Sequence, residues 1–254
     1  MGAPMAAAVS TAADLLLAAR QNGRRLAMLP DEVRPHTRGD AYAIQDAVVS
    51  KLGAIGGWKV GAKNASAEPT CAPLPATLIL RSPQRFAAGR FALNGIEAEL
   101  AFTLSHDLPA RPQPYCAADL KAAVATVHTA IEIVDSRFDD LSAVDPLSVL
   151  ADFQSNGALV VGDGVALPHA FDSSMQEVTL EIDGIRVVES RGSNPAGEVL
   201  SLLVWLANHA ATRNGGLRRG DIITTGSWTG MRFVGSGTRV DAEFAGIGGV
   251  SVGF

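Results

Sequence analysis

The sequence has few cysteines and no long apolar run. Its two cysteines, Cys71 and Cys116, show no CxxC spacing, so a disulfide scaffold is excluded and a reducing compartment is expected. No stretch approaches the roughly 18 consecutive apolar residues that a membrane-spanning helix requires. The first residues also carry no basic segment of a secretory signal. We therefore expect a cytoplasmic protein without a membrane partner.

Positive charge is scarce and scattered. The formal net charge is −5, and no run of lysine and arginine exceeds two residues. Because nucleic-acid backbones are bound by clustered cations, we expect no nucleic-acid partner. The chain has four lysines, and two of them, Lys59 and Lys63, share one short segment.

Several common catalytic motifs are missing. The chain has no GxGxxG after a strand, no Walker A loop, no HExxH and no GxSxG. These absences exclude the simplest dinucleotide, nucleotide, zinc-protease and serine-hydrolase interpretations. The five histidines are scattered, and the spacing of His128 and Glu132 does not by itself predict a metal site.

The residues that are present indicate a large core, since 47% of them are hydrophobic. Periodicity predicts helices from a Ser10 N-cap toward Leu26, and over about 40–52, 117–128 and 196–211. Strands are expected at 57–61, 96–104, 178–182, 185–188, 221–225, 238–244 and 250–254, with a hairpin turn at Asp183-Gly184. We expect an α+β, mainly β protein, with a helical N-terminal region at 1–55 and one compact β domain at 56–254.

Three carboxylates lie in apolar segments. Glu97 and Glu99 are two apart on an expected strand, so they share a face and repel unless water, a cation or a proton intervenes. The continuation through Phe102 is apolar on both faces, which is typical of a covered strand. Glu132 stands among apolar β-branched residues, where an unpaired carboxylate is costly. If the three converge, they suit a hard divalent cation, Mg²⁺ or Mn²⁺, rather than zinc.

Lys59 lies between Trp58 and Val60 in a strand bounded by glycines. A lysine at such a position either extends its ammonium group to the surface or is held near carboxylates. The residues alone leave both alternatives open.

Six segments extend the pattern along the chain. They are 41–45 (AYAIQ), 56–61 (GGWKVG), 96–99 (IEAE), 130–137 (AIEIVDSR), 155–158 (SNGA), and the pair 205–208 (WLAN) and 217–222 (LRRGDI). In this order they resemble the 2-keto-4-pentenoate hydratase and 4-oxalocrotonate decarboxylase family, which belongs to the fumarylacetoacetate hydrolase superfamily. The resemblance implies the mixed β-roll of that superfamily.

The resemblance also implies a site and an activity. Glu97, Glu99 and Glu132 would match the metal ligands, Lys59 the active-site lysine, and Ser155 a substrate contact. The implied enzyme is a divalent-metal-dependent hydratase of aromatic meta-cleavage catabolism. It would add water to a 2-hydroxy-2,4-dienoate to give a 4-hydroxy-2-oxo acid. The family further implies a homo-oligomer, with association to a homologous decarboxylase or a downstream aldolase as an added prospect.

One departure from the family pattern bears on the water-addition step. Family members commonly carry an acid in a segment like F-A-D-M after the lysine strand, and Thr77 stands at the comparable position. A hydroxyl is not an effective base near neutral pH, so the sequence predicts slow hydration that Thr77→Asp would accelerate. The segments at 64–74 and 195–198 also differ from the family pattern.

Three alternatives remain open at this point. A 4-oxalocrotonate-type decarboxylase would use the same enolate chemistry. An acylpyruvate hydrolase needs a His–Glu pair, for which only His36 and Glu32 are placed, with Pro35 between them disfavouring a regular helix. A non-catalytic partner subunit is disfavoured because buried charges without a function cost stability.

Overall fold

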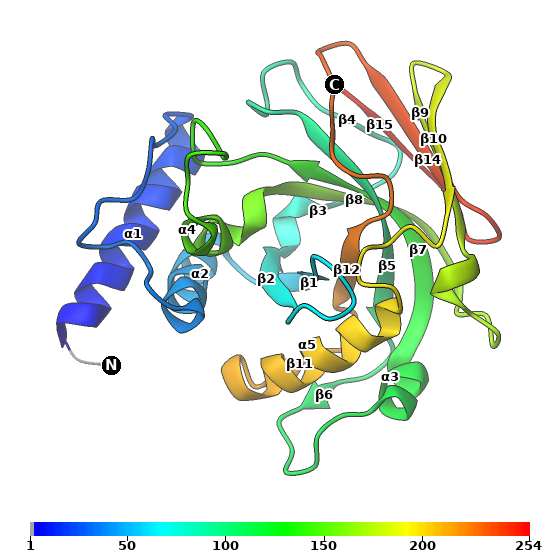
Figure 1. The fold of residues 1–254 in the computed structure, drawn as a ribbon, viewed down its shortest axis with the longest axis horizontal. Helices are drawn as coiled ribbons and strands as arrows, with labels where there is room; N and C mark the ends of the chain where they lie inside the picture. The colour runs from blue at the N-terminus through cyan, green and yellow to red at the C-terminus, as the bar shows by residue number, and fades with distance from the viewer. Residues whose placement is uncertain (1–2) are drawn as a thin grey trace.

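The computed structural model describes residues 3–254 (Figure 1). Its helices are α1 (Ala3–Asn22), α2 (Arg38–Leu52), α3 (Ala117–Ala123), α4 (Pro146–Ala151) and α5 (Val199–Arg213), with 3₁₀ turns η1 (Ala76–Leu78), η2 (Phe153–Ser155) and η3 (Ser173–Met175). Its strands are β1 (Ile55–Gly61), β2 (Thr70–Pro75), β3 (Ile79–Arg81), β4 (Gln84–Arg85), β5 (Gly95–Leu104), β6 (Leu108–Pro109), β7 (Val124–Val134), β8 (Asn156–Ala166), β9 (Glu177–Ile182), β10 (Ile185–Arg191), β11 (Gly216–Leu217), β12 (Ile222–Ser227), β13 (Arg232–Phe233), β14 (Arg239–Phe244) and β15 (Gly248–Gly253).

Two mixed sheets form the body of the molecule. The large sheet runs β2-β1-β12-β5-β7-β8-β3, with β13 paired to β5, and the small sheet runs β10-β9-β14-β15-β4. Most neighbouring strands are antiparallel, but β1 with β12, β3 with β8 and β4 with β15 are parallel. Figure 1 shows the small sheet at the upper right, next to β7 and β8 of the large sheet. This arrangement confirms the predicted α+β, mainly β class.

The two sheets meet backbone to backbone. A Cβ placed on Gly162 of β8 would lie 2.3 Å from the carbonyl oxygen of Gly249 in β15, so only glycine permits this approach. The hydroxyl of Thr129 on β7 also donates to the carbonyl of Gly248. The small sheet is thereby held against the strands that carry the candidate site.

Helices pack on strands of the large sheet. α5 packs on β1 and β12 (Figure 1) through Val199, Leu200, Leu202, Leu203, Leu206, Ala207 and Ala210. α1 packs on α2, and α2 packs on β2 and α4. The buried amide of Gln45 in α2 donates to the carbonyls of Cys71 and Leu150, at 3.1 and 2.5 Å, and so ties these elements together.

Two local predictions are wrong. Ser10 lies inside α1, which begins at Ala3, so it is not an N-cap. The helix expected over 117–128 ends at Ala123, and β7 begins at Val124. Residues 124–134 are rich in β-branched side chains and pair along β5, and this pairing outweighs the helical pattern of the preceding turn.

Other local predictions are confirmed. Asp183 and Gly184, with φ of 52° and 77°, form the turn between β9 and β10, as a two-residue hairpin loop requires. α2 spans Arg38–Leu52, close to the expected 40–52, and it begins at a capping box in which the Thr37 hydroxyl accepts from the N–H of Asp40.

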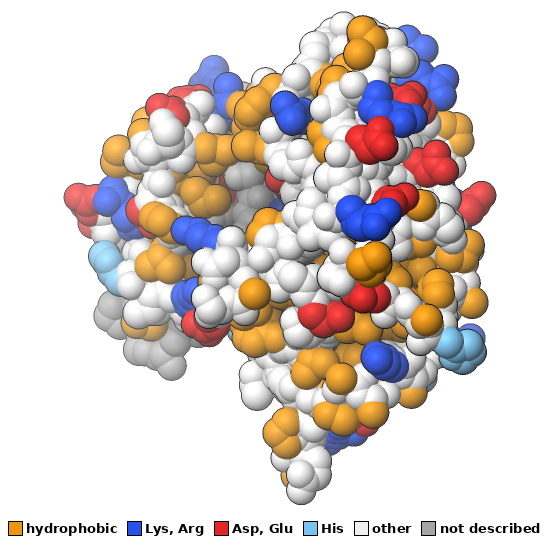
Figure 2. Space-filling model, turned by 45° about the vertical axis from the view of Figure 1, so that its right-hand side comes forward, with side chains coloured by type: hydrophobic (Ala, Val, Ile, Leu, Met, Phe, Trp, Pro, Cys, Tyr) orange, Lys and Arg blue, Asp and Glu red, His pale blue; other side chains and the backbone are white. Residues whose placement is uncertain are grey.

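The surface view shows charges of both signs close together over the small sheet (Figure 2). Arg186 pairs there with Glu181 and Glu189, and Arg239 pairs with Asp241. Within residues 3–254, no helix combines the length and apolar composition needed to cross a membrane.

Candidate functional site

The pairing of β5 with β7 brings the three predicted carboxylates together. Glu97 and Glu132 are direct cross-strand partners, and Glu99 follows Glu97 on the same face. One oxygen of each carboxylate lies within 4.8 Å of the others. Glu99 and Glu132 are buried, with 1% and 0% of their surface exposed.

Lys59 reaches the same point from β1. Its Nζ lies 2.6 Å from Oε1 of Glu132 and donates to the carbonyl of Gln154 at 3.2 Å. Only 12% of its side chain is exposed, so the alternative near the carboxylates is the one observed. A Cβ on Gly57 would lie 2.1 Å from the carbonyl oxygen of Ile222, so this glycine lets β1 approach β12 and sets the position of Lys59.

Neighbouring polar groups hold the carboxylates in place. Glu99 accepts hydrogen bonds from the hydroxyl of Thr224 and, at 3.0 Å, from the N–H of Gly226. Oε1 of Glu132 accepts from the side-chain amide of Asn156 at 2.8 Å. Oε2 of Glu132 is buried and has no hydrogen-bond partner among the described residues. A buried carboxylate oxygen without a donor is costly, and a bound cation would satisfy it.

The pKa values reflect this crowding. Burial, followed by the charge of Glu132, raises the pKa of Glu97 to about 7. Burial and the charges of Glu132 and Glu97 raise the pKa of Glu99 well above its usual value. Burial acts to lower the pKa of Lys59, but the three carboxylates outweigh it, and the pKa is raised. Crowding of buried like charges therefore favours the protonated forms of Glu97 and Glu99.

These groups line a cavity of about 410 Å³, here called the carboxylate cavity. Its size is within the range of small-molecule sites. It is lined by Arg38, Lys59, Val60, Gly61, Ala62, Lys63, Ala67, Glu68, Thr70, Glu97, Glu99, Glu132, Gln154 and Gly226.

A family model described as fumarylacetoacetate (FAA) hydrolase C-terminal matches residues 57–252, which hold all of the clustered side chains. The chain belongs to the fumarylacetoacetate hydrolase family. It is 31% identical to 2-keto-4-pentenoate hydratase 2 of Dechloromonas aromatica over 97% of both chains. It is 29% identical to the TodF product hydratase of Pseudomonas putida over 97% of this chain and 95% of that one.

A solved structure shares the fold over the same span. The 4-oxalocrotonate decarboxylase of Pseudomonas putida G7, complexed with magnesium and adipate, superposes with a TM-score of 0.86 at 25% identity, covering 97% of both chains. The fumarylacetoacetate hydrolase fold that the motifs imply is therefore confirmed.

A strained turn at residues 153–155 directly precedes β8 and contacts Lys59. Phe153, Gln154 and Ser155 have φ values of 54°, 51° and 60°, a left-handed conformation that is costly for residues other than glycine. The turn presents the carbonyl of Gln154 to Lys59, and the Gln154 amide donates to the hydroxyl of Thr70 at 2.9 Å. Strain of this kind persists only where surrounding contacts hold it.

Ser155, the predicted substrate contact, does not line the carboxylate cavity. Its hydroxyl is buried and has no hydrogen-bond partner among the described residues. Gln154 lines the cavity instead. Strand alternation over residues 153–156 could not distinguish Ser155 from Gln154, because the left-handed turn breaks the alternation of side chains.

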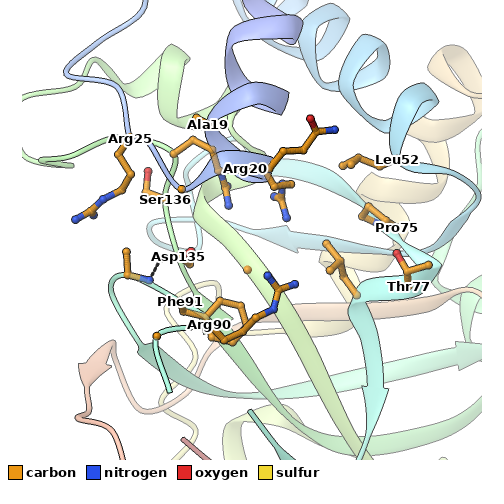
Figure 3. Close-up of a pocket in the computed structure, with 17 residues that line it drawn as sticks. Ala19, Arg20, Arg25, Leu52, Pro75, Thr77, Arg90, Phe91, Asp135 and Ser136 are labelled. Carbon is orange, nitrogen blue, oxygen red and sulfur yellow. Dashed lines mark hydrogen bonds between the residues drawn. The ribbon is translucent and has the colours of Figure 1, made fainter. Parts of the chain in front are cut away.

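Thr77 is not where the family pattern suggested. It lies in η1 and lines a second cavity, which shares no lining residue with the carboxylate cavity (Figure 3). The expectation that Thr77 handicaps water addition therefore has no support in the geometry.

His36 and Glu32, the pair considered for hydrolysis, are exposed, and neither lines the carboxylate cavity. The backbone N–H of His36 donates to the carboxylate of Asp40 in the α2 capping box.

Sequence reasoning missed Arg38, Thr70 and Thr224 as parts of the site. No pattern in the sequence distinguishes them from other polar residues. They reach the site because α2 carries Arg38, β2 carries Thr70 and β12 carries Thr224, and these elements are folded around β1. For Thr224, the TTG triplet after the Gly220-Asp221 turn was the one available signal.

Proposed function

We propose that this chain is a divalent-metal-dependent hydratase. It adds water to a 2-hydroxy-2,4-dienoate of the 2-oxopent-4-enoate type and yields a 4-hydroxy-2-oxo acid. The observation that carries the proposal is the meeting of Glu97, Glu99, Glu132 and Lys59 in one cavity. It is supported by near full-length similarity to proteins named 2-keto-4-pentenoate hydratase.

We assign the metal to the three carboxylates, as Mg²⁺ or Mn²⁺. The ligand set is all oxygen, the oxygens are close enough to share one ion, and Oε2 of Glu132 needs a partner. A related decarboxylase structure contains magnesium. When bound, such an ion would act as a Lewis acid toward the substrate's 2-oxygen.

The protein's own groups account for the proton movements. In the first step the enol O–H proton leaves and C5 of the dienol gains a proton, giving a 2-oxo-3-enoate. In the second step water adds its oxygen to C4 while C3 gains a proton. Lys59 is the group placed to give a proton to carbon and then to take one back, because its ammonium lies within the cluster and donates to Glu132 at 2.6 Å. Its positive charge also stabilises negative charge developing on the 2-oxygen.

Charge at the cavity also suits an anionic acid. Arg38 and Lys63 line the cavity in addition to Lys59. Arg38 is bound to Glu68 at 2.7 Å, so Lys63 is the cation that is left to meet a substrate carboxylate. Ser155 could contact substrate only after the 153–155 turn reorganises, so we assign that contact to Gln154.

The proposal is tested by following the loss of ultraviolet absorbance of 2-hydroxypenta-2,4-dienoate in Mg²⁺. We expect saturable turnover to 4-hydroxy-2-oxopentanoate, identified by NMR. Turnover should be lost after the metal is removed and restored when it is returned. Release of carbon dioxide from 4-oxalocrotonate without hydration of the dienoate would identify the protein as a decarboxylase instead.

That decarboxylase is the second candidate, because a solved decarboxylase covers 97% of this chain with the same fold. The acylpyruvate hydrolase is less favoured, since His36 and Glu32 lie outside the carboxylate cavity. A non-catalytic subunit is disfavoured by the buried Lys59–Glu132 pair, which is costly to keep without a use.

We further propose a cytoplasmic homo-oligomer, able to associate with a homologous decarboxylase or a downstream aldolase. Both cysteines are free, which suits a reducing compartment. Light scattering of the purified protein measures the oligomer, and a single monomeric species would contradict this part of the proposal.

A further inference from the structure

The second cavity, of about 370 Å³, lies between α1, η1 and the loop before β5 (Figure 3). Four arginines line it, namely Arg20, Arg25, Arg90 and Arg137, together with one carboxylate, Asp135. None of the proposed catalytic residues is among its lining residues.

Two of the four arginines are paired within the protein. Nε of Arg25 lies 3.7 Å from the carboxylate of Asp139. Arg137 is buried and forms an ion pair with Asp152. These two guanidinium groups therefore have structural partners.

The carboxylate of Asp135 is also engaged. Its Oδ1 accepts the backbone N–H groups of Ala92 and Leu93, both at 3.0 Å, and so fixes the loop that leads into β5 (Figure 3). Among the described residues, no arginine nitrogen lies within 4.0 Å of the Asp135 carboxylate.

Arg20 and Arg90 are different. Across residues 3–254, no carboxylate oxygen lies within 4.0 Å of either guanidinium group. Arg20 is half-buried and donates only to the backbone carbonyl of Asn156, at 3.0 Å. Burial and the nearby charge of Arg137 lower the pKa of Arg20 to about 9, against the opposing charges of Asp152 and Asp135, and Arg90 adds a smaller lowering. An anion in the cavity would relieve this repulsion.

The rest of the lining is largely apolar. Leu52, Pro75, Leu78 and Phe91 form walls that an inorganic ion would leave unused. The volume fits a small organic molecule. Figure 3 shows Arg20 entering from α1 and Arg90 from the opposite side of the hollow.

We propose that this cavity binds a small organic acid, with its carboxylate held between Arg20 and Arg90 and its carbon chain against Phe91 and Leu78. Guanidinium groups bind carboxylates through paired N–H donors, which accounts for the use of arginine here. The site is separate from the proposed hydratase site and does not depend on that function.

The test uses succinate as the probe and full-length protein freed of metal on a chelating resin, so that no soluble chelator competes. Isothermal titration calorimetry at constant ionic strength should give saturable binding of succinate. Neutral succinamide should not bind. Arginine Nε–Hε NMR signals of Arg20 and Arg90 should shift with the same saturation curve.

Variants locate the binding site. Arg20→Gln and Arg90→Gln should each weaken succinate binding about tenfold or more, and Arg90, on an exposed loop, can be replaced without disturbing α1. Arg24→Gln, an exposed arginine outside the cavity, and Lys63→Gln, in the carboxylate cavity, should bind as the wild type does.

Four results would overturn the proposal. The first is the absence of succinate binding by the wild type at concentrations about 20-fold above the millimolar dissociation constant expected of a weak ligand. The second is equal binding by Arg20→Gln, Arg90→Gln and wild type. The third is loss of binding in Lys63→Gln alone, which would move the anion to the carboxylate cavity. Equal affinity for inorganic phosphate would show that the apolar walls play no part and would also contradict an organic acid.

Discussion

At the scale of single residues, Lys59 combines two roles that can be separated. Its ammonium offsets the charge of Glu132 and is the proposed proton carrier. We expect Lys59→Met to retain Mg²⁺ while turnover falls by roughly 10²–10⁴-fold, the range for loss of a general acid–base group. Calorimetry with Mg²⁺ and the dienoate assay measure the two effects. Lys121→Met, which removes an exposed lysine elsewhere, is the control, and equal activity of both variants would return Lys59 to a packing role.

The three carboxylates give a second prediction at this scale. Replacing Glu97, Glu99 or Glu132 by Gln keeps the shape of the side chain but removes one charge from the proposed ligand set. We expect each variant to bind Mg²⁺ more weakly by tenfold or more and to lose turnover, as measured by calorimetry and the dienoate assay. Glu68→Gln, which lines the same cavity but pairs with Arg38, should bind Mg²⁺ as the wild type does. Unchanged affinity in all three variants would contradict the ligand assignment.

At the scale of elements, the contact between β1 and β12 positions the lysine. Gly57→Ala would place a Cβ 2.1 Å from the carbonyl oxygen of Ile222, so β1 must shift. We expect a loss of about 1–3 kcal/mol in the free energy of unfolding, measured with urea, and a fall in turnover because Lys59 moves with β1. Gly61→Ala, on the same strand, meets nothing nearer than 3.9 Å and should be nearly neutral for stability. Equal destabilisation by both substitutions would argue against this contact.

The position of η1 gives a prediction opposite to the one that the sequence suggests. Thr77 lines the second cavity and not the carboxylate cavity. We therefore expect Thr77→Asp to change the hydration rate less than twofold in the dienoate assay. A clear acceleration would show that η1 moves toward Lys59 during the reaction.

At the scale of the whole molecule, the buried acids make stability depend on pH. The folded-state pKa of Glu97 is about 7, above its ordinary value of 4.5, so the folded protein holds a proton that the unfolded chain releases between those values. The free energy of unfolding of metal-free protein should therefore fall as pH rises from about 4.5 to 7. Urea unfolding of wild type and Glu97→Gln measures the difference.

We expect the wild type to lose stability relative to Glu97→Gln across this pH range, with no further relative change above it. Millimolar Mg²⁺ should reduce the loss, because the ion stabilises the ionised carboxylates. A relative stability that is flat or rises with pH would contradict the raised pKa.

The sequence by itself determined the fold class and named the candidate site residues. Alternating strand patterns located β5 and the β9–β10 hairpin, because a period of two is a local property. The same alternation put Glu97 and Glu99 on one face, and the apolar neighbours of Glu132 and the strand position of Lys59 made these two residues candidates.

Only the tertiary structure decided which of these residues meet and which do not. Cross-strand register sets Glu97 opposite Glu132, and the parallel pairing of β1 with β12 brings Lys59 to them from residues far away in the chain. The left-handed turn at 153–155 presents Gln154 rather than Ser155, and η1 carries Thr77 to another cavity. These outcomes depend on long-range pairing and backbone strain, which no local pattern of residues encodes.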